Sequence, residues 1–210
     1  MTRNLAELSN QLEELHTLVR VCKDCRLCES RTLAVPGEGE VAADIMFVGE
    51  APGHVNDQVG RPFVGHGGKI FDNILDDVGI SRQRVFITNA VKCWPPDNRK
   101  PKADELKACK KYLDAQIELV SPRVIFALGS TAFSILTDTN IKLKEEHGKV
   151  VYRNKIPVCA LFHPNGIRYI RGGRATIAQG IRSALEELHL QPLQSSSQLM
   201  YVQASLFGEL

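Results

Sequence analysis

The chain has 210 residues, of which 43% are hydrophobic and 24% charged, with a formal net charge of +2. This length suffices for one domain with a hydrophobic core. No apolar run approaches the roughly 18 residues that span a bilayer, and so small a net charge excludes a polycation, so nucleic-acid binding would need a local basic patch. The first ten residues lack an apolar signal core, and we therefore expect a cytoplasmic protein without a membrane anchor.

The first predicted element is an amphipathic helix over residues 3–20, which is followed by a cysteine motif, Cys22-Lys23-Asp24-Cys25-Arg26-Leu27-Cys28. Clustered cysteines in a reducing compartment more often bind metal than form disulfides. Two further candidates, Cys93 and Cys109, flank a polar loop, whereas Cys159 lies in a buried-strand pattern and is expected to be a small hydrophobe. Five candidates thus compete for a four-ligand site, and spacing alone leaves zinc, an iron–sulfur cluster or inert cysteines open.

A glycine-rich stretch, residues 49–65, follows an apolar run over residues 44–48 that reads as a buried strand. It precedes a helical pattern over residues 66–78. The stretch is therefore expected to be a loop at the carboxyl end of a strand, where open α/β sheets bind ligands. It carries polar groups that can position water or move protons, and an aromatic ring: Glu50, His54, Asn56, Asp57 and Phe63.

The second predicted strand, residues 84–88, ends at Asn89, again at the ligand-binding edge of such a sheet. From Lys92 to Lys111 there are seven Lys or Arg against three acidic residues, together with Trp94. This stretch is expected either to lie against phosphates or to form a solvated helix face.

The remaining elements alternate. We expect a helix over residues 103–120, a strand over 123–129, a short helix capped by Ser130, a short extra strand over 149–152, a fourth main strand over 157–162 and a helix over 173–189. The fourth strand ends at His163-Pro164. Alternating strands and helices predict a mostly parallel sheet that is covered on both faces, in a domain of residues 1–190. Residues 191–210 read as a flexible tail with a short apolar motif.

Three separated motifs together resemble the family-4, iron–sulfur uracil-DNA glycosylases. They are Gly-Glu-Ala-Pro-Gly with Gly-Arg-Pro-Phe-Val-Gly in residues 49–65, Thr-Asn-Ala-Val-Lys-Cys in 88–93, and His-Pro at 163–164. The resemblance covers about residues 5–188, and it implies a three-layer α/β/α sandwich with a central, mostly parallel four-stranded sheet. It implies a DNA repair enzyme that flips out uracil and hydrolyses its N-glycosidic bond, and a structural 4Fe–4S cluster on Cys22, Cys25, Cys93 and Cys109, with Cys28 outside the usual set.

The resemblance also assigns the site. Phe63 would stack on the flipped base, the Asn89 amide would read uracil against cytosine, and His163 would stabilise charge on the leaving base. The candidate catalytic residues are Asp57, His163, Glu50 and Asn56, and the candidate substrate-binding residues are Glu50, Ala51, Gly53, Phe63, Asn89 and His163. Asn56 departs from the Glu that family members usually carry there, and Asn56 can orient water but cannot take a proton.

The tail sequence Gln203-Ala204-Ser205-Leu206-Phe207 resembles the peptide that binds bacterial sliding clamps, and less closely the clamp-binding box of archaea and eukaryotes. The resemblance implies that Gln203, Leu206 and Phe207 contact a clamp, which would raise the enzyme's effective concentration at new DNA. The other expected partner is uracil-containing DNA, and we expect a monomer.

Competing hypotheses come from other classes of protein. The departures at Asn56 and His54 would also fit a non-hydrolytic or covalently trapping uracil-DNA-binding protein of the same fold. A phosphate-binding loop would need the Gly-Lys-Ser/Thr ending that residues 49–68 lack. An electron-transfer protein would need the compact cysteine run of the ferredoxins, whereas the remaining cysteines here are far apart in sequence.

Overall fold

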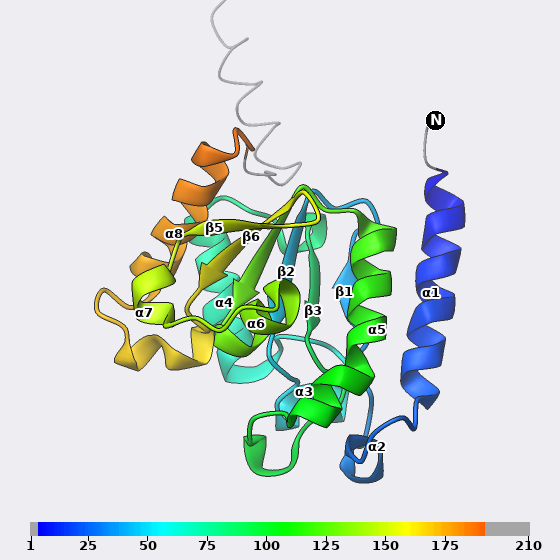
Figure 1. The fold of residues 1–210 in the computed structure, drawn as a ribbon. Helices are drawn as coiled ribbons and strands as arrows, with labels where there is room; N and C mark the ends of the chain where they lie inside the picture. Colours follow the sequence, from blue (N-terminus) through cyan, green and yellow to red (C-terminus); the bar gives the residue numbers. More distant parts are fainter. Residues whose placement is uncertain (1–3, 192–210) are drawn as a thin grey trace, which may run out of the picture.

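A six-stranded mixed sheet forms the centre of the molecule (Figure 1). The structure is a computed structural model, and it describes residues 4–191. The strands are β1 (Glu38–Gly39), β2 (Ile45–Gly49), β3 (Phe86–Asn89), β4 (Val124–Leu128), β5 (Val150–Arg153) and β6 (Ile156–Leu161). The helices are α1 (Leu5–Val21), α2 (Leu27–Ser30), α3 (His54–Val59), α4 (Gly65–Asp77), α5 (Ala103–Val120), α6 (Ser130–Thr137), α7 (Leu143–Glu146) and α8 (Arg174–Glu187). Short 3-10 helices span Arg82–Arg84 (η1), Pro96–Asn98 (η2) and Pro164–Tyr169 (η3).

The strand order is β1-β3-β2-β4-β6-β5. The four inner strands are parallel, and the two edge strands, β1 and β5, pair antiparallel with their neighbours. The prediction of a mostly parallel four-stranded core is thus confirmed, with the extra strand near residue 150 at one edge. A sixth strand, β1, is not among the elements that the sequence predicted. A strand of two residues is too short to show an alternation of apolar and polar side chains, so only its pairing with Phe86 and Ile87 defines it.

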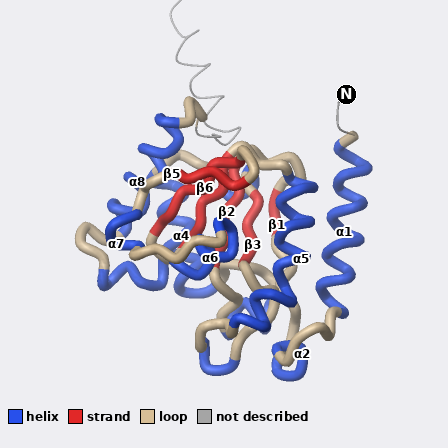
Figure 2. Tube along the Cα trace, viewed as in Figure 1, coloured by secondary structure: helices blue, strands red, loops and turns tan. Residues whose placement is uncertain are grey.

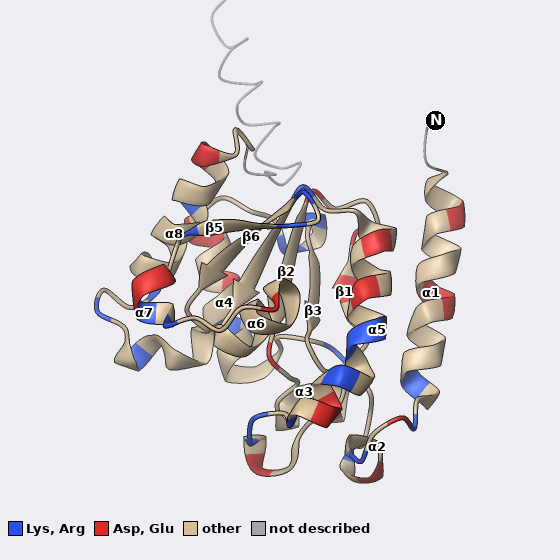
Figure 3. Cartoon of the chain, viewed as in Figure 1, with Lys and Arg blue, Asp and Glu red and all other residues tan. Residues whose placement is uncertain are grey.

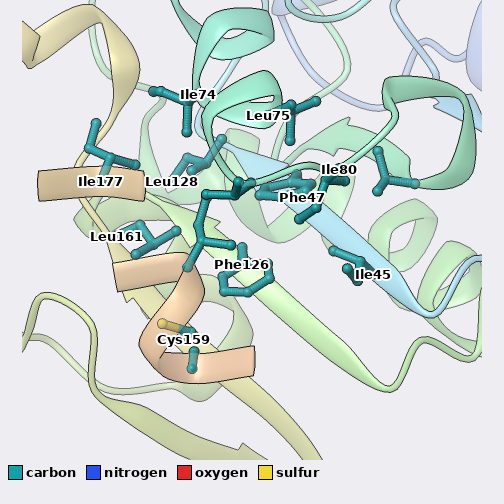
Figure 4. Close-up of a cluster of buried hydrophobic side chains, with 14 of the residues drawn as sticks. Ile45, Phe47, Ile74, Leu75, Ile80, Phe126, Leu128, Cys159, Leu161 and Ile177 are labelled. Atoms are coloured by element: carbon teal, nitrogen blue, oxygen red, sulfur yellow. The ribbon is translucent and has the colours of Figure 1, made fainter. Parts of the chain in front are cut away.

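Helices cover both faces of the sheet, as Figure 2 shows with helices in blue around strands in red. The β2, β4 and β6 strands are wholly or almost wholly buried, which explains their unbroken apolar runs. One face packs under α4 and α8, and Figure 4 shows its side chains, among them Phe47, Phe126 and Ile177. The other face packs under α1, α5 and α6. Cys159 lies within the first core, which confirms its assignment as a small buried hydrophobe.

Two local predictions need correction. Ser130 is the first residue of α6 rather than its cap, because the N-cap is Gly129, which has φ +100° and no side chain. Residues 49–65 were expected to be loop throughout, but they contain α3, a six-residue helix that ends at Gly60 in the left-handed conformation. The helix is too short, and its Val55 and Val59 too exposed, to produce an apolar period.

The predicted tail lies outside the described residues, apart from Gln191. Within residues 4–191, no helix is both long and apolar enough to cross a bilayer.

Candidate active site and cysteine cluster

An open cleft of about 950 Å³ lies at the carboxyl ends of the parallel strands. Its walls come from the segments that follow β2, β3, β4 and β6, as the rule for ligand sites in open α/β sheets requires. The cleft brings together most of the residues that the sequence singled out: Glu50, Ala51, Gly53, Asn56, Phe63, Asn89 and His163. Of the candidate catalytic and substrate-binding residues, Asp57 alone does not line the cleft.

Asn89 ends β3 beside Gly49, the last residue of β2. The Asn89 side chain is only 2% exposed. A Cβ atom on Gly49 would lie 2.3 Å from Asn89 Oδ1 and 2.7 Å from the Phe63 ring. The absence of a side chain at Gly49 therefore lets the Asn89 amide and the Phe63 ring meet at one point of the cleft.

Phe63 has an unusual backbone, with φ +49° in the left-handed region that bulky residues avoid. Its ring lies over His163, with centroids 5.9 Å apart and planes 26° apart. The Phe71 ring of α4 supports it from another side at 4.8 Å. The Phe63 ring is mostly buried, so its position is set by packing and not by solvent.

His163 sits between β6 and the 3-10 helix η3, where its ring accepts a hydrogen bond. The backbone N–H of Asn165 donates to Nδ1 at 3.2 Å. Burial lowers the pKa of His163 to about 4, so the ring is neutral near pH 7. Because Nδ1 accepts, the single proton of the neutral ring is assigned to Nε2.

Glu50 begins the loop after β2, and its carboxylate accepts a hydrogen bond from the Thr131 hydroxyl of α6. The Glu50 backbone carbonyl also accepts from Val91 N at 3.2 Å. The loops after β2 and β3 are thereby joined, and Glu50 is held toward the first turn of α6.

Asp57 and Asn56 occupy different environments although they are neighbours in α3. Asp57 is fully buried, and its two carboxylate oxygens accept from Thr32 N at 3.0 and 2.9 Å. The structure thus separates Asp57 from the cleft and gives it a role in anchoring residue 32. Asn56 lines the cleft, but its amide is occupied: Oδ1 accepts from Gly53 N and Nδ2 donates to Arg61 O, both at 2.9 Å.

The basic stretch of residues 92–111 is less available to phosphates than its sequence indicates. Lys92 is 1% exposed, Arg99 pairs with Glu105 at 2.7 Å, and Lys110 and Lys111 pair with Asp114 and Asp24. Figure 3 shows blue segments in the loop that leads into α5 and on the lower part of α5. Arg99 and Lys100 line the cleft on that side, and Arg168 lines it from η3.

Lys92 was expected on the surface and is instead the centre of a buried polar network. Its ammonium donates to Thr88 Oγ1, Asn89 O and Gln116 Oε1 at 2.6–2.7 Å. Burial lowers the pKa of Lys92 to about 8. The Asn89 backbone carbonyl is thus held from behind the cleft, a contact that no sequence pattern indicates.

Five cysteines converge on one small hollow under α1 and α5: Cys22, Cys25, Cys28, Cys93 and Cys109. Two sulfurs accept hydrogen bonds, Cys93 from Arg31 Nη1 at 3.0 Å and Cys109 from Lys92 N at 3.3 Å. Within residues 4–191, no group of three or more His, Cys, Asp or Glu side chains is arranged to hold a metal ion. The donor set still fits a thiolate-bound iron–sulfur cluster in its chemistry, because it supplies at least four sulfurs and N–H donors directed at two of them.

The sequence of the chain, including the segments that line the cleft, matches a known family. The family model of the uracil DNA glycosylase superfamily matches residues 36–188. The type-4 uracil-DNA glycosylase of Sulfurisphaera tokodaii is 42% identical over 172 residues, which cover 74% of this chain and 78% of that protein. Those of Saccharolobus solfataricus and Thermotoga maritima are 42% and 41% identical, covering 83% and 73% of this chain and 85% and 81% of those proteins. The chain therefore belongs to the uracil-DNA glycosylase superfamily, and within it to the type-4 uracil-DNA glycosylases.

Proposed function

We propose that this protein flips uracil out of DNA and hydrolyses its N-glycosidic bond, leaving an abasic site for base excision repair. The observation that carries the proposal is the meeting of three groups at one point of the cleft: the Phe63 ring, the Asn89 amide and the His163 ring. Together they can stack on a base, read its edge and receive its developing charge. The family to which the chain belongs supports the same reaction.

Asn89 selects uracil. Its amide N–H donates to uracil O4, and its amide oxygen accepts from uracil N3–H. Cytosine presents an amino donor and an unprotonated ring nitrogen at the same positions, so it would leave buried polar groups unpaired. Each unpaired group costs about 1–3 kcal/mol, which is ample for discrimination at a side chain as buried as Asn89.

His163 stabilises the leaving uracil. As the bond between the sugar and N1 breaks, negative charge develops on the base, and the Nε2–H of the neutral imidazole donates to uracil O2. The backbone N–H of Asn165 fixes this tautomer by donating to Nδ1. The ring therefore needs no proton from solvent, and the low pKa of His163 suits the role.

Glu50 serves the attacking water and the cationic sugar. Of the described residues that line the cleft, it is the one carboxylate. Thr131 orients it, whereas Asp57 is committed to Thr32 N. We therefore assign the catalytic carboxylate to Glu50 rather than to Asp57. Ala51 and Gly53 bring backbone close to the substrate from the same loop.

Cys22, Cys25, Cys93 and Cys109 would hold a 4Fe–4S cluster, which would serve a structural role because hydrolysis requires no electron transfer. When bound, the cluster would cross-link the segment after α1, the segment after β3 and α5. The N–H groups of Arg31 and Lys92 donate to two of the sulfurs. We also propose that the protein works in the cytoplasm, a proposal that the six free cysteines support because a reducing compartment keeps thiols unpaired. We also propose that the protein works as a monomer, a proposal consistent with one chain supplying every group named for the reaction.

The tail gives the enzyme a second partner. Gln203, Leu206 and Phe207 bind a sliding clamp, and the described domain acts on DNA without them. Deleting residues 199–210 is expected to abolish clamp pull-down and to leave the rate on an oligonucleotide unchanged. Retained pull-down would show that the clamp contact lies elsewhere.

The proposed reaction is tested by single-turnover cleavage of a uracil-containing oligonucleotide, followed by alkali and a denaturing gel. Matched oligonucleotides with cytosine, thymine and hypoxanthine serve as controls. Strand breaks at uracil that disappear in Asn89→Ala and His163→Ala support both the reaction and the site. A uracil-dependent complex without breaks would identify a non-hydrolytic binder, and wild-type rates in both variants would refute the site.

A further inference from the structure

Phe63 belongs to a strained segment, residues 61–64. Three of the four backbone carbonyls of this segment are held by side-chain nitrogens of neighbouring residues. Arg61 O accepts from Asn56 Nδ2 at 2.9 Å, and Pro62 O accepts from Arg82 Nη2 at 2.8 Å. Val64 O lies 3.5 Å from the same Asn56 nitrogen. Residues that adopt a left-handed backbone without being glycine persist only when the surroundings enforce that conformation, and these donors supply the enforcement.

The remaining carbonyl of the segment is fixed by close packing. A Cβ atom on Gly68 would lie only 2.0 Å from Phe63 O. The first turn of α4 thus abuts the strained residue directly, and only glycine permits the approach. Gly68 thus packs against the Phe63 backbone, and Phe71 packs against the Phe63 ring.

Arg82 is itself anchored, so it acts as a fixed donor. Its guanidinium pairs with Glu38 of β1 at 2.8 Å and with Asp72 of α4 at 2.7 Å. Glu38 also pairs with Arg61, at the start of the strained segment, at 2.7 Å. Arg82 and Glu38 are each 23% exposed, which protects this network from full screening by solvent.

The two hydrogen-bond partners of the Asn56 side chain require an amide at position 56. Its Oδ1 accepts from Gly53 N while its Nδ2 donates to Arg61 O, so the side chain joins the loop after β2 to the segment that carries Phe63. A carboxylate can accept from Gly53 N but cannot donate to a carbonyl. These partners also fix the orientation of the amide, because the reversed orientation would place Asn56 Oδ1 against Arg61 O.

We propose that Asn56 and Arg82 are positioning residues that hold Phe63 against the flipped base, and that Asn56 takes no part in the proton transfers of the reaction. This inference rests on the proposed function, in which Phe63 stacks on uracil. It changes the expectation for Asn56, which the sequence suggested as a residue that orients water. Loss of either donor releases the strained segment, so the ring leaves the position in which it stacks on the base.

The test compares uracil binding with chemistry in the cluster-loaded full chain. Asn56→Asp keeps the acceptor and removes the donor. We expect the inhibition constant of free uracil and the KM for the oligonucleotide to rise about 10-fold, because base–aromatic stacking is worth that much. The kcat is expected to fall by less than about threefold, since no catalytic group is removed.

Arg82→Lys provides a second variant, because it retains the charge near Glu38 and Asp72 but not the planar fork that reaches Pro62 O. It is expected to raise the same two constants. Arg84→Gln is the matched control on the same 3-10 helix: Arg84 pairs with Glu40 at the surface and should leave both constants unchanged. Thermal unfolding of each variant identifies any loss of fold.

The outcomes separate the inference from the function on which it rests. If the wild-type protein fails to cleave at uracil, the proposed function is wrong. If it cleaves, and Asn56→Asp and Arg82→Lys bind free uracil as tightly as the wild type, the positioning role is wrong. A large fall in kcat of Asn56→Asp with unchanged uracil inhibition would return Asn56 to the chemistry.

Discussion

Thr131 offers the most direct test of the assignment of Glu50, because its hydroxyl is the side-chain donor that orients the Glu50 carboxylate. Thr131→Val removes that donor and preserves the branched shape of the side chain. Valine and threonine have similar helix propensities, and α6 otherwise keeps its contacts with the sheet. The substitution therefore perturbs the orientation of Glu50 with little change in fold.

The magnitude follows from one hydrogen bond to a charged group, which is worth about 1.5–3 kcal/mol. Thr131 and Glu50 are both half-buried, so solvent replaces part of the lost bond and the lower end of that range applies. Each 1.36 kcal/mol changes a rate tenfold. We expect Thr131→Val to lower the single-turnover rate about 10-fold, and Thr131→Ser, which keeps the hydroxyl, to stay near the wild-type rate.

The assay is single-turnover cleavage of a uracil oligonucleotide at saturating enzyme, with Glu50→Gln and the Glu50→Gln/Thr131→Val double variant in parallel. Because Thr131 acts through Glu50, the double variant should be no slower than Glu50→Gln alone. A Thr131→Val rate within twofold of the wild type would refute the assignment. If adding Thr131→Val to Glu50→Gln lowered the single-turnover rate by the same factor as Thr131→Val alone, Thr131 would act independently of Glu50.

Four further predictions concern Lys92, the histidines with lowered pKa values and the cysteine cluster. Lys92→Met should lower the free energy of unfolding by about 1–3 kcal/mol, because the Asn89 carbonyl loses its donor. Urea denaturation of the cluster-loaded protein measures this, and an unchanged midpoint and slope would contradict it. Burial lowers the pKa of His16 and of His163 from 6.5 to about 4. The unfolded chain therefore takes up protons near pH 6.5 that the folded chain refuses, and stability should be full above pH 6.5 and fall as the pH drops toward 4. The single-turnover rate should accordingly show no inflection from His163 near pH 6.5, and one there would mean that the ring titrates normally. Cys28→Ser should retain the iron content of the wild type and Cys109→Ser should lose it, as measured by iron analysis and visible absorbance. Iron loss in Cys28→Ser would instead make Cys28 a ligand.

The sequence alone predicted the elements whose patterns are local. The parallel strands β2, β4 and β6 are continuous apolar runs because both of their faces are buried, and α5 was predicted at its observed bounds. Once the strands are parallel, their carboxyl ends share an edge, so the sequence alone leads one to expect Asn89 and His163 in one cleft. The motifs around them identified the family by resemblance.

Other features depended on contacts between residues far apart in the chain. Glu50 and Thr131 are 81 positions apart, and Lys92 and Gln116 are 24 apart. A local pattern carries no record of such pairs, because they exist only after the sheet has formed and the helices have packed on it. For the same reason the short strand β1 escaped prediction, since its partner β3 defines it.

Asp57 and Lys92 show most clearly what the tertiary structure decided. By residue type both belong on a polar surface, Asp57 as a candidate catalytic group and Lys92 as a contact for phosphates. Packing buries both and gives each a full set of hydrogen-bond partners, because a buried charge is tolerated only when it is satisfied. The sequence determined which chemical groups reach the functional edge of the sheet, and the tertiary structure decided which of them face the substrate and which hold the others in place.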